Sequence, residues 1–247
     1  MTFSLAVYSP KTKQIGLAQA SCGLFTGTTC PLICPSGRFI GTIQAFVNRS
    51  IKADILQILA LSGSVQSLDA ELRANDPFYE YRQLAIIGFD GQAFGHTGKN
   101  ASPVAGHLLG DNFVVAGNML TEISCLDAMV EDFVKSESAP FGERLVSALE
   151  AGKNAGGQSA DGRKLRERAA CVMVYDEAGA CHLNLRIDMS SDAIKALREL
   201  WSAYSVYDHF MEVCEKTPES LVSLDEQDRM VPHAPSIFEE ISDSASD

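Results

Sequence analysis

Apolar and polar residues alternate along the first strand-length stretch of the chain, residues 2–9, where the apolar positions are Phe3, Leu5 and Val7. This period of two predicts a half-buried strand. The polar segment SPKTKQ predicts a turn, and the following IGLAQASC predicts a second strand over residues 15–22. Small residues leave one face of that second strand almost bare: Gly16, Ala18 and Ala20. A bare face lets another backbone or a substrate approach closely.

The remainder of the chain shows both strand and helix patterns. Strand patterns cover residues 38–48, 82–98, 104–108, 111–118 and 169–187. Amphipathic helix patterns cover residues 50–62, 64–76, 121–133, 140–151 and 191–214. Ser50 and Ser64 are the expected N-caps of the first two helices. Glycine-rich and polar segments at 23–37 and 151–164 predict loops, the second of them a mobile lid.

The order of these elements indicates the fold class. Hairpins alternate with pairs of helices, which matches neither a strict strand–helix alternation nor an all-strand meander. We therefore expect an α+β domain of antiparallel sheets with helices layered outside, over residues 1–214. Residues 215–247 form an acidic extension, and its end, from about Pro235, is expected to be disordered because it is serine-rich, acidic and poor in apolar residues.

Charge and composition exclude several classes of function. The net charge of −12 argues against nucleic acid and anionic membranes as partners. No apolar run approaches the roughly 18 residues that span a bilayer, and no basic region precedes an apolar stretch at the N-terminus. We therefore expect a cytoplasmic protein. Seven cysteines without a CxxC pair predict free thiols, and the absence of HExxH or HxxxH spacing predicts no metal site. No cofactor motif is present, and we expect none.

Thr2 is the first candidate for chemistry. Initiator methionine is usually removed when a residue as small as threonine follows it. An N-terminal threonine offers a nucleophilic hydroxyl and, on the same residue, an amine that can act as the base. The alternative is that Thr2 only begins a strand.

Other polar residues at strand ends are candidates for binding or for stabilising an oxyanion. The neutral hydrogen-bonding groups are Ser21, Gln44, Asn48 and Asn118. Asn118 precedes a predicted helix, so its amide could face a developing oxyanion or simply cap that helix. Cys22 could be a nucleophile paired with a histidine, or a small buried thiol. His96 and His107, both near glycine, are either catalytic groups or turn-stabilising imidazoles.

Five ordered motifs resemble a known family: MTFSLAVYSPKTKQIGLAQAS, GTIQAFVN, RQLAIIGFDGQAFGHTG, AGHLLGDNFVVAGNML and GERLVSALEAG. Together they are similar to the prokaryotic family filed as domain of unknown function 1028, over about residues 2–200. That family is similar in fold to N-terminal-nucleophile (Ntn) hydrolases. The resemblance implies a four-layer αββα sandwich of two antiparallel sheets. It also places Thr2 where Ntn hydrolases carry their nucleophile.

Two departures from these patterns qualify the implied chemistry. Proteasome-type Ntn sites carry an aspartate in the second strand and a lysine in the third, and this chain has neither. Acylase-type Ntn enzymes use asparagine and glutamine amides instead, which suits Gln44, Asn48 and Asn118. Relatives commonly read QSAA where Glu167-Arg168-Ala169-Ala170 stand here, so a changed substrate or a lost activity would both fit.

The leading hypothesis is thus an Ntn-type hydrolase acting on a small or peptide-like amide. Thr2 would be the nucleophile, with Asn118, Asn48 and Gln44 assisting catalysis. Substrate contacts would come from Ser21, Cys22 and His96. A catalytically silent scaffold that binds a small molecule or a protein is the alternative, and a Cys22–histidine hydrolase is third. A homodimer is left open.

Overall fold

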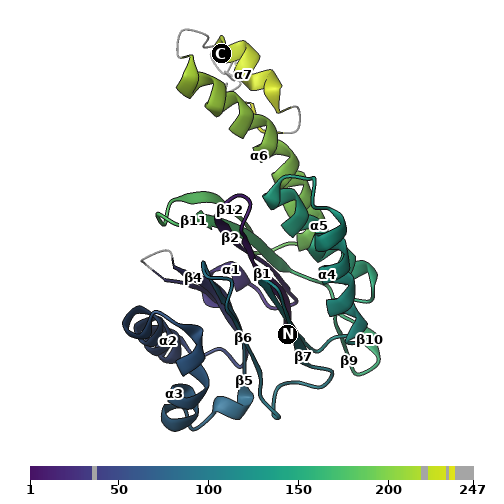
Figure 1. The fold of residues 1–247 in the computed structure, drawn as a ribbon. Coiled ribbons are helices and arrows are strands. Elements are labelled where there is room, and N and C mark those ends of the chain that lie inside the picture. Colours follow the sequence, from purple (N-terminus) through teal and green to yellow (C-terminus); the bar gives the residue numbers. More distant parts are fainter. Residues whose placement is uncertain (35–37, 218–221, 232–233, 237–247) are drawn as a thin grey trace, which may run out of the picture. The chain divides into compact units, whose positions relative to one another are not determined.

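The protein was analysed as a computed structural model that describes residues 1–34, 38–217, 222–231 and 234–236. Two compact units divide the chain, Met1–Leu197 and Arg198–Asp247. The first unit contains two large antiparallel sheets with helices on their outer sides (Figure 1). The predicted α+β sandwich of two antiparallel sheets is confirmed.

The larger sheet has six strands in the order β12-β11-β2-β1-β8-β7. Their bounds are β1 Thr2–Ser9, β2 Gln14–Ser21, β7 Gly106–Gly110, β8 Phe113–Asn118, β11 Ala169–Asp176 and β12 Cys181–Ile187. The smaller sheet has the order β3-β4-β5-β6, with β3 Pro31–Ile33, β4 Phe39–Ala45, β5 Arg82–Gly88 and β6 Ala93–Thr97. A separate hairpin pairs β9 (Ser159–Ala160) with β10 (Arg163–Lys164).

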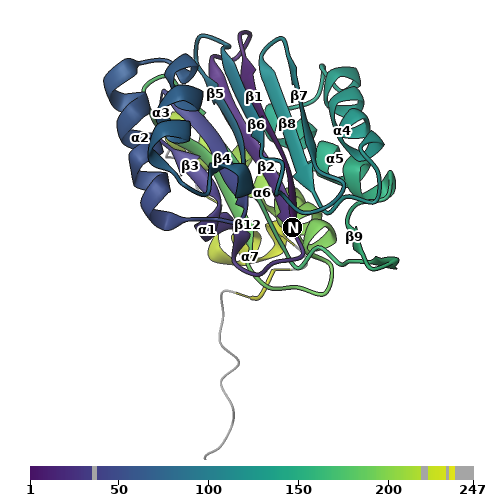
Figure 2. The ribbon, with the colours of Figure 1, turned by 90° about the horizontal axis from the view of Figure 1, so that it is seen from below.

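Helices cover the outer face of each sheet (Figures 1 and 2). The smaller sheet is covered by α2 (Arg49–Ser62) and α3 (Leu68–Asn75), and the larger by α4 (Ser124–Lys135) and α5 (Phe141–Asn154). Short helical turns complete this unit: α1 Thr26–Thr29, η1 Val65–Ser67 and η2 Tyr79–Tyr81. The long helix α6 (Ala193–Lys216) begins in the first unit, and α7 (Leu224–Met230) belongs to the second.

Apolar layers between the sheets, and between each sheet and its helices, hold the sandwich together. Between the sheets lie Ala6, Tyr8, Ile15, Leu17, Ile40, Ala85, Ile87, Val114, Ala116, Cys171 and Met173. Outside the smaller sheet, α2 contributes apolar residues at helical spacing, Ile51, Ile55 and Leu59. The burial of each such side chain stabilises the fold by roughly 1.5–3 kcal/mol, compared with leaving it exposed.

The opening hairpin differs from its prediction in one respect. Every residue of β1 is buried, so the strand is not half-buried. The polar members of the alternation share a face with Ala6 and Tyr8 and point toward the other sheet, whereas Phe3 lies on the side of α5. A strand buried on both faces therefore carries Thr2 and Ser4 into the interior.

The bare face of β2 is occupied by a helix. A Cβ atom added at Gly16 would lie 2.7 Å from the Leu145 side chain of α5. Gly16 therefore permits close packing of the helix on the sheet. The element that lies close to this bare face is α5, and not a substrate.

Several local predictions need correction. Ser50 does not cap α2, because the cap is Asn48, whose side chain accepts a hydrogen bond from the Ser50 N–H. The segment 151–164 is not one loose loop, since α5 extends to Asn154 and β9 and β10 form a hairpin within it. Helix α7 was missed inside the acidic extension. The predicted disorder beyond residue 236 lies outside the described residues.

Candidate active site

Thr2 lies at the start of a central strand of the larger sheet. Its register partners are Ser21 on β2 and Asn118 on β8. These three side chains share the face that looks toward the smaller sheet, because directly opposed residues of antiparallel strands point the same way. The Thr2 hydroxyl donates a hydrogen bond to Ser21 Oγ at 3.2 Å, and only 3% of Thr2 is exposed.

Ser21 forms hydrogen bonds with Thr2, Met1 and Gly23. Its hydroxyl accepts from Thr2 and from the Gly23 N–H, at 2.9 Å, and donates to the Met1 carbonyl. A serine hydroxyl has one proton and two lone pairs, so all three of its positions are used. Loss of Met1 would therefore leave the Ser21 proton without its present acceptor.

Met1 contacts Ser21 and Cys22 next to the candidate nucleophile. The Met1 thioether sulfur lies 3.2 Å from Cys22 Sγ. Burial lowers the pKa of the amino group at Met1, so an amine at this end of the strand is held closer to its neutral, basic form. Burial also raises the pKa of the Cys22 thiol, although the nearby amino group and Arg168 oppose this. The thiol is thus mostly protonated at neutral pH and a poor nucleophile.

A chain of amide side chains runs from this cluster across the gap between the sheets. Ser4 Oγ donates to Gln44 Oε1 at 3.0 Å, and Gln44 Nε2 donates to Gln83 Oε1 at 2.8 Å. Asn118 Nδ2 donates to the same Gln83 oxygen at 2.8 Å. Gln83 thereby links Gln44 on one sheet to Asn118 on the other.

Gln83 was missed by sequence reasoning, although a signal was present. It follows Arg82 at the start of β5, directly before the apolar run of that strand, and it is completely buried. Its Nε2 donates to Thr97 Oγ1 and to the carbonyls of Gly106 and Gly117, at 2.8–3.0 Å. A polar residue placed in a buried strand must have such partners, since burying it unpaired costs roughly 1–3 kcal/mol.

Asn118 retains one unused acceptor. Its Oδ1 atom is buried and has no hydrogen-bond partner within the described residues. Asn118 is itself completely buried beside Thr2. An orphaned acceptor here can receive a proton donor from an amine at Thr2 or from a substrate.

Gln158 is a second residue that the sequence did not reveal. Its Oε1 accepts from the Cys22 N–H at 3.1 Å, and its Nε2 donates to the Asn118 carbonyl at 3.0 Å. It is completely buried, so the segment predicted as a lid is pinned at this point. Gln158 joins the ends of β2 and β8, the two strands that flank Thr2.

Two predicted site residues lie elsewhere. Asn48 caps α2, with its Oδ1 2.9 Å from the Ser50 nitrogen. His96 pairs in register with Leu84, a residue of the outer core, and its ring stacks on Tyr79 at 3.8 Å between centroids. The structure therefore brings Thr2, Ser21, Cys22, Gln44 and Asn118 into one region and does not bring His96 there.

His107 reaches the amide chain from the edge of the larger sheet. Its Nδ1 lies 2.9 Å from Thr97 Oγ1, which in turn accepts from Gln83. Burial lowers the pKa of His107, with a smaller contribution from His96, so the neutral imidazole is favoured. Hydrogen bonds through Thr97 and Gln83 connect this imidazole to Asn118, the register partner of Thr2.

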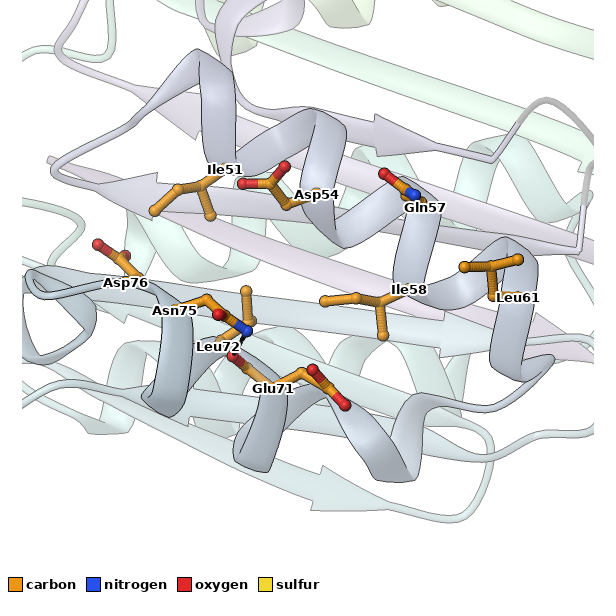
Figure 3. Close-up of a pocket in the computed structure, with 9 residues that line it drawn as sticks. All are labelled: Ile51, Asp54, Gln57, Ile58, Leu61, Glu71, Leu72, Asn75 and Asp76. Atoms are coloured by element: carbon orange, nitrogen blue, oxygen red, sulfur yellow. Dashed lines mark hydrogen bonds between the residues drawn. The ribbon is translucent and has the colours of Figure 1, made fainter.

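A cavity of about 330 Å³ lies between α2 and α3, away from this cluster (Figure 3). Its apolar side chains, among them Ile58 and Leu72, lie between the two helices, with Asp54 and Glu71 at the sides. It is a surface groove over the outer core and contains none of the predicted site residues.

Within the residues described, no group of three histidine, cysteine, aspartate or glutamate side chains is arranged to hold a metal ion. In the same residues, no helix has the length and apolar character needed to cross a membrane.

Comparison with known proteins places this sandwich in a family. A family of unknown function (DUF1028) matches residues 2–197. The chain belongs to this family. The match spans nearly all of the first unit and stops where the second begins.

A solved structure supports the assignment. The crystal structure of protein SPO2555 from Silicibacter pomeroyi, of the same DUF1028 family, is 28% identical and superimposes with a TM-score of 0.71. The similarity covers 81% of this chain and 88% of that one. No curated protein matches the chain.

Proposed function

We propose that this DUF1028 protein is an Ntn-type amide hydrolase whose nucleophile is Thr2. The observation that carries the proposal is the Thr2 hydroxyl, buried at the start of a central strand and hydrogen-bonded to Ser21. The sandwich of two antiparallel sheets between helix pairs supports it, since Ntn hydrolases share that architecture. Activity requires removal of what precedes Thr2, so that its own nitrogen becomes a free amine.

Loss of Met1 changes the hydrogen bonds around Ser21. The Met1 carbonyl that accepts from Ser21 disappears, and the Ser21 hydroxyl becomes free to bond the new amine of Thr2. The orphaned Asn118 Oδ1 is a second acceptor for that amine. Both contacts would orient the amine to take the proton from Thr2 Oγ1.

The reaction then follows the order expected of an N-terminal nucleophile. Thr2 Oγ1 attacks the amide carbon while its proton passes to the α-amine. The C–N bond breaks, the amine leaving group takes that proton, and an ester to Thr2 remains. Water, activated by the same amine, hydrolyses the ester and releases the acid.

Amide groups are the available stabilisers of the oxyanion. Asn118 Nδ2 has two protons and donates one of them to Gln83, which leaves the other for a substrate oxygen. Gln44 bonds Ser4 and Gln83 and is better placed to hold Gln83 than to touch substrate. The role of Asn48 as a donor remains a prediction from sequence, and its oxygen is already used at the start of α2.

One observation favours the alternative of a silent binding scaffold. Ser21, like Thr2, is almost completely buried, at 4% exposed, and its hydroxyl bonds the Met1 carbonyl. If Met1 is retained, the α-amine is blocked by a peptide bond and the hydrolytic mechanism is lost.

A covalent probe distinguishes these functions. A β-lactone should acylate Thr2 in protein that lacks Met1, and Thr2→Ala should abolish the labelling. Cys22→Ser is the matched control, because the thiol is a second nucleophile in the same region, and it should leave labelling intact. Labelling that persists in Thr2→Ala and disappears in Cys22→Ser would transfer the nucleophile to Cys22. An absence of labelling with Met1 removed would favour the scaffold.

A further inference from the structure

The surface groove between α2 and α3 combines apolar side chains with negative charge (Figure 3). Residues from Ile51 to Leu61 line it on α2, and residues from Glu71 to Asp76 line it on the side of α3. At a rise of 1.5 Å per residue, the α2 side extends for about 15 Å, or roughly three turns. A groove of this length along a helix is suited to a further helix, because helices pack by placing side-chain ridges into such grooves.

Apolar side chains of the groove remain accessible to a partner. Leu72 is buried at 2% exposed, and Ile58 is half-buried. Leu61 is 80% exposed, more than any other large apolar side chain in the part of the chain that the structure describes. A single exposed leucine is common on protein surfaces. Here, however, Leu61 follows Ile58 by three residues on the same helix and lines the same groove, so the two form an apolar strip in contact with water.

The charged side chains that line the groove, among the described residues, are all carboxylates. Asp76 is already neutralised, because Arg82 Nε lies 2.9 Å from its Oδ2. Asp54 and Glu71 are both exposed, one on each helix, and neither has an ion-pair partner within the residues described. The two helices therefore present an unpaired carboxylate on each side of the apolar strip.

The cations of these helices do not compensate for this charge. Arg73 on α3 pairs with Asp69 and Glu80 instead. Arg49 and Lys52 on α2 are not among the residues that line the groove. The local negative charge thus adds to that of the whole chain, which carries a net charge of −12.

This charge distribution favours one kind of occupant. In a two-fold contact between two copies of this chain, the same face would meet itself, and the carboxylates of one groove would lie against those of the other. Like charges placed together in an interface cost affinity. An anionic membrane surface would be repelled for the same reason. A partner with cations beside its apolar side chains is complementary to the groove.

We propose that the groove between α2 and α3 is a docking site for a cationic amphipathic helix of a partner protein. Apolar side chains of that helix would cover Ile58 and Leu61, and its lysine or arginine side chains would pair with Asp54 and Glu71. An apolar helix face laid into a hydrophobic groove is a recurring mode of peptide recognition. The groove contains none of the residues around Thr2, so the proposal does not depend on the proposed hydrolysis.

Synthetic peptides test the proposal by fluorescence anisotropy with the full chain. The probe is a labelled peptide of about 14 residues, roughly 20 Å long as a helix, with leucine at i, i+3, i+4 and i+7 and lysine at the other positions. One control peptide has glutamate in place of lysine, and another has the same composition in an order that destroys the leucine spacing. We expect saturable binding of the probe, binding of each control weaker by roughly tenfold or more, and a loss of affinity with added salt.

Variants of the groove locate the bound peptide. Leu61→Ser should weaken the probe by roughly fivefold or more, because the most exposed part of the apolar strip is lost. The double variant Asp54→Asn/Glu71→Gln should weaken it by roughly tenfold and should reduce the salt dependence, because both unpaired carboxylates are removed. These side chains are exposed, so the substitutions should leave the fold intact.

Matched control variants lie on α4, outside the groove. Val134→Ser removes an apolar side chain that is 58% exposed, and Asp127→Asn/Glu131→Gln removes two exposed carboxylates. Both controls should bind the probe as the wild type does. The proposal is overturned if the probe shows no saturable binding, if either control peptide binds equally well, or if the groove variants bind as tightly as the α4 variants.

Sedimentation of the chain without peptide tests the competing occupant. We expect the same sedimentation for the wild type and Leu61→Ser. A dimer that Leu61→Ser dissociates would overturn the proposal, because a second copy of the chain would then occupy the groove. These results are independent of the β-lactone experiment, because peptide binding is measured without turnover.

Discussion

Thr2 and Asn118 face each other across β1 and β8 as a register pair, with both side chains buried between the two sheets. Asn118 is held from its other side by Gln83, 2.8 Å away, and its Oδ1 is left without a partner. This arrangement sets the hydroxyl of the proposed nucleophile beside an amide that still has one donor and one acceptor position to offer. The predictions on catalysis follow from this pair.

The first prediction is that Met1 is removed from the protein. Intact-mass measurement of protein from its native host should show that Met1 is absent and Thr2 is the first residue. The reason is that initiator methionine is usually removed before a residue as small as threonine, and its removal frees the Ser21 hydroxyl from the Met1 carbonyl. Complete retention of Met1 would rule out Thr2 as an N-terminal nucleophile.

Asn118→Ala should slow β-lactone acylation of Thr2 by roughly 100-fold, the usual effect of removing one oxyanion donor. Measurement of the acylation rate by mass spectrometry checks this, with unfolding followed in parallel. Asn75→Ala is the control, because that amide bonds only the Glu71 carbonyl on the exposed side of α3. An unchanged rate in Asn118→Ala would mean that Asn118 only holds Gln83 in place and does not stabilise the oxyanion.

Arg82→Ala should destabilise the fold by roughly 3–5 kcal/mol. Arg82 Nε lies 2.9 Å from Asp76 Oδ2, both side chains are less than a tenth exposed, and removal of one partner leaves a buried charge unpaired. Denaturant unfolding measures the loss. Arg73→Ala is the matched control, because its pairs with Asp69 and Glu80 are largely exposed and worth about 0–1 kcal/mol. Similar losses in the two variants would contradict this account.

The sequence predicted the large elements well because their apolar periodicity is strong. The hairpin of β5 and β6 and the outer face of α2 followed directly from spacing. The short strand β3 and the hairpin of β9 and β10 did not follow from spacing. These strands have only two or three residues each, too few to show a period, and they lie in segments that contain glycine or proline.

The candidate site could be predicted only in part. Thr2, Ser21 and Asn118 lie at strand ends, where polar residues attract notice in a sequence. Gln83 and Gln158 have hydrogen-bond partners 14 to 136 positions away, and periodicity carries no information about such contacts. His96 lies near a strand end and beside a glycine, as the sequence indicates. The face of the strand that it occupies depends on the register, and a shift of one residue would move it to the other face.

Glu167→Gln should stabilise the protein at neutral pH, and the gain should shrink in acid. Burial raises the folded-state pKa of Glu167 above its ordinary value of 4.5, and the charged groups nearest to it are Lys153, Lys164 and Asp192. Between 4.5 and the raised pKa, the folded protein keeps a proton that the unfolded chain releases. The stability of the wild type therefore falls as the pH rises through that interval, and the loss persists above it.

Glutamine has no proton to lose, so the variant escapes this fall. Unfolding by urea at a series of pH values from about 4 to 8 should show the free-energy difference between Glu167→Gln and wild type growing with pH and then levelling off. Glu131→Gln removes the same charge from an exposed position on α4, and should stay within about 0.5 kcal/mol of wild type at each pH. A difference for Glu167→Gln that is constant over the whole series would mean that this carboxyl group finds a partner when the protein folds.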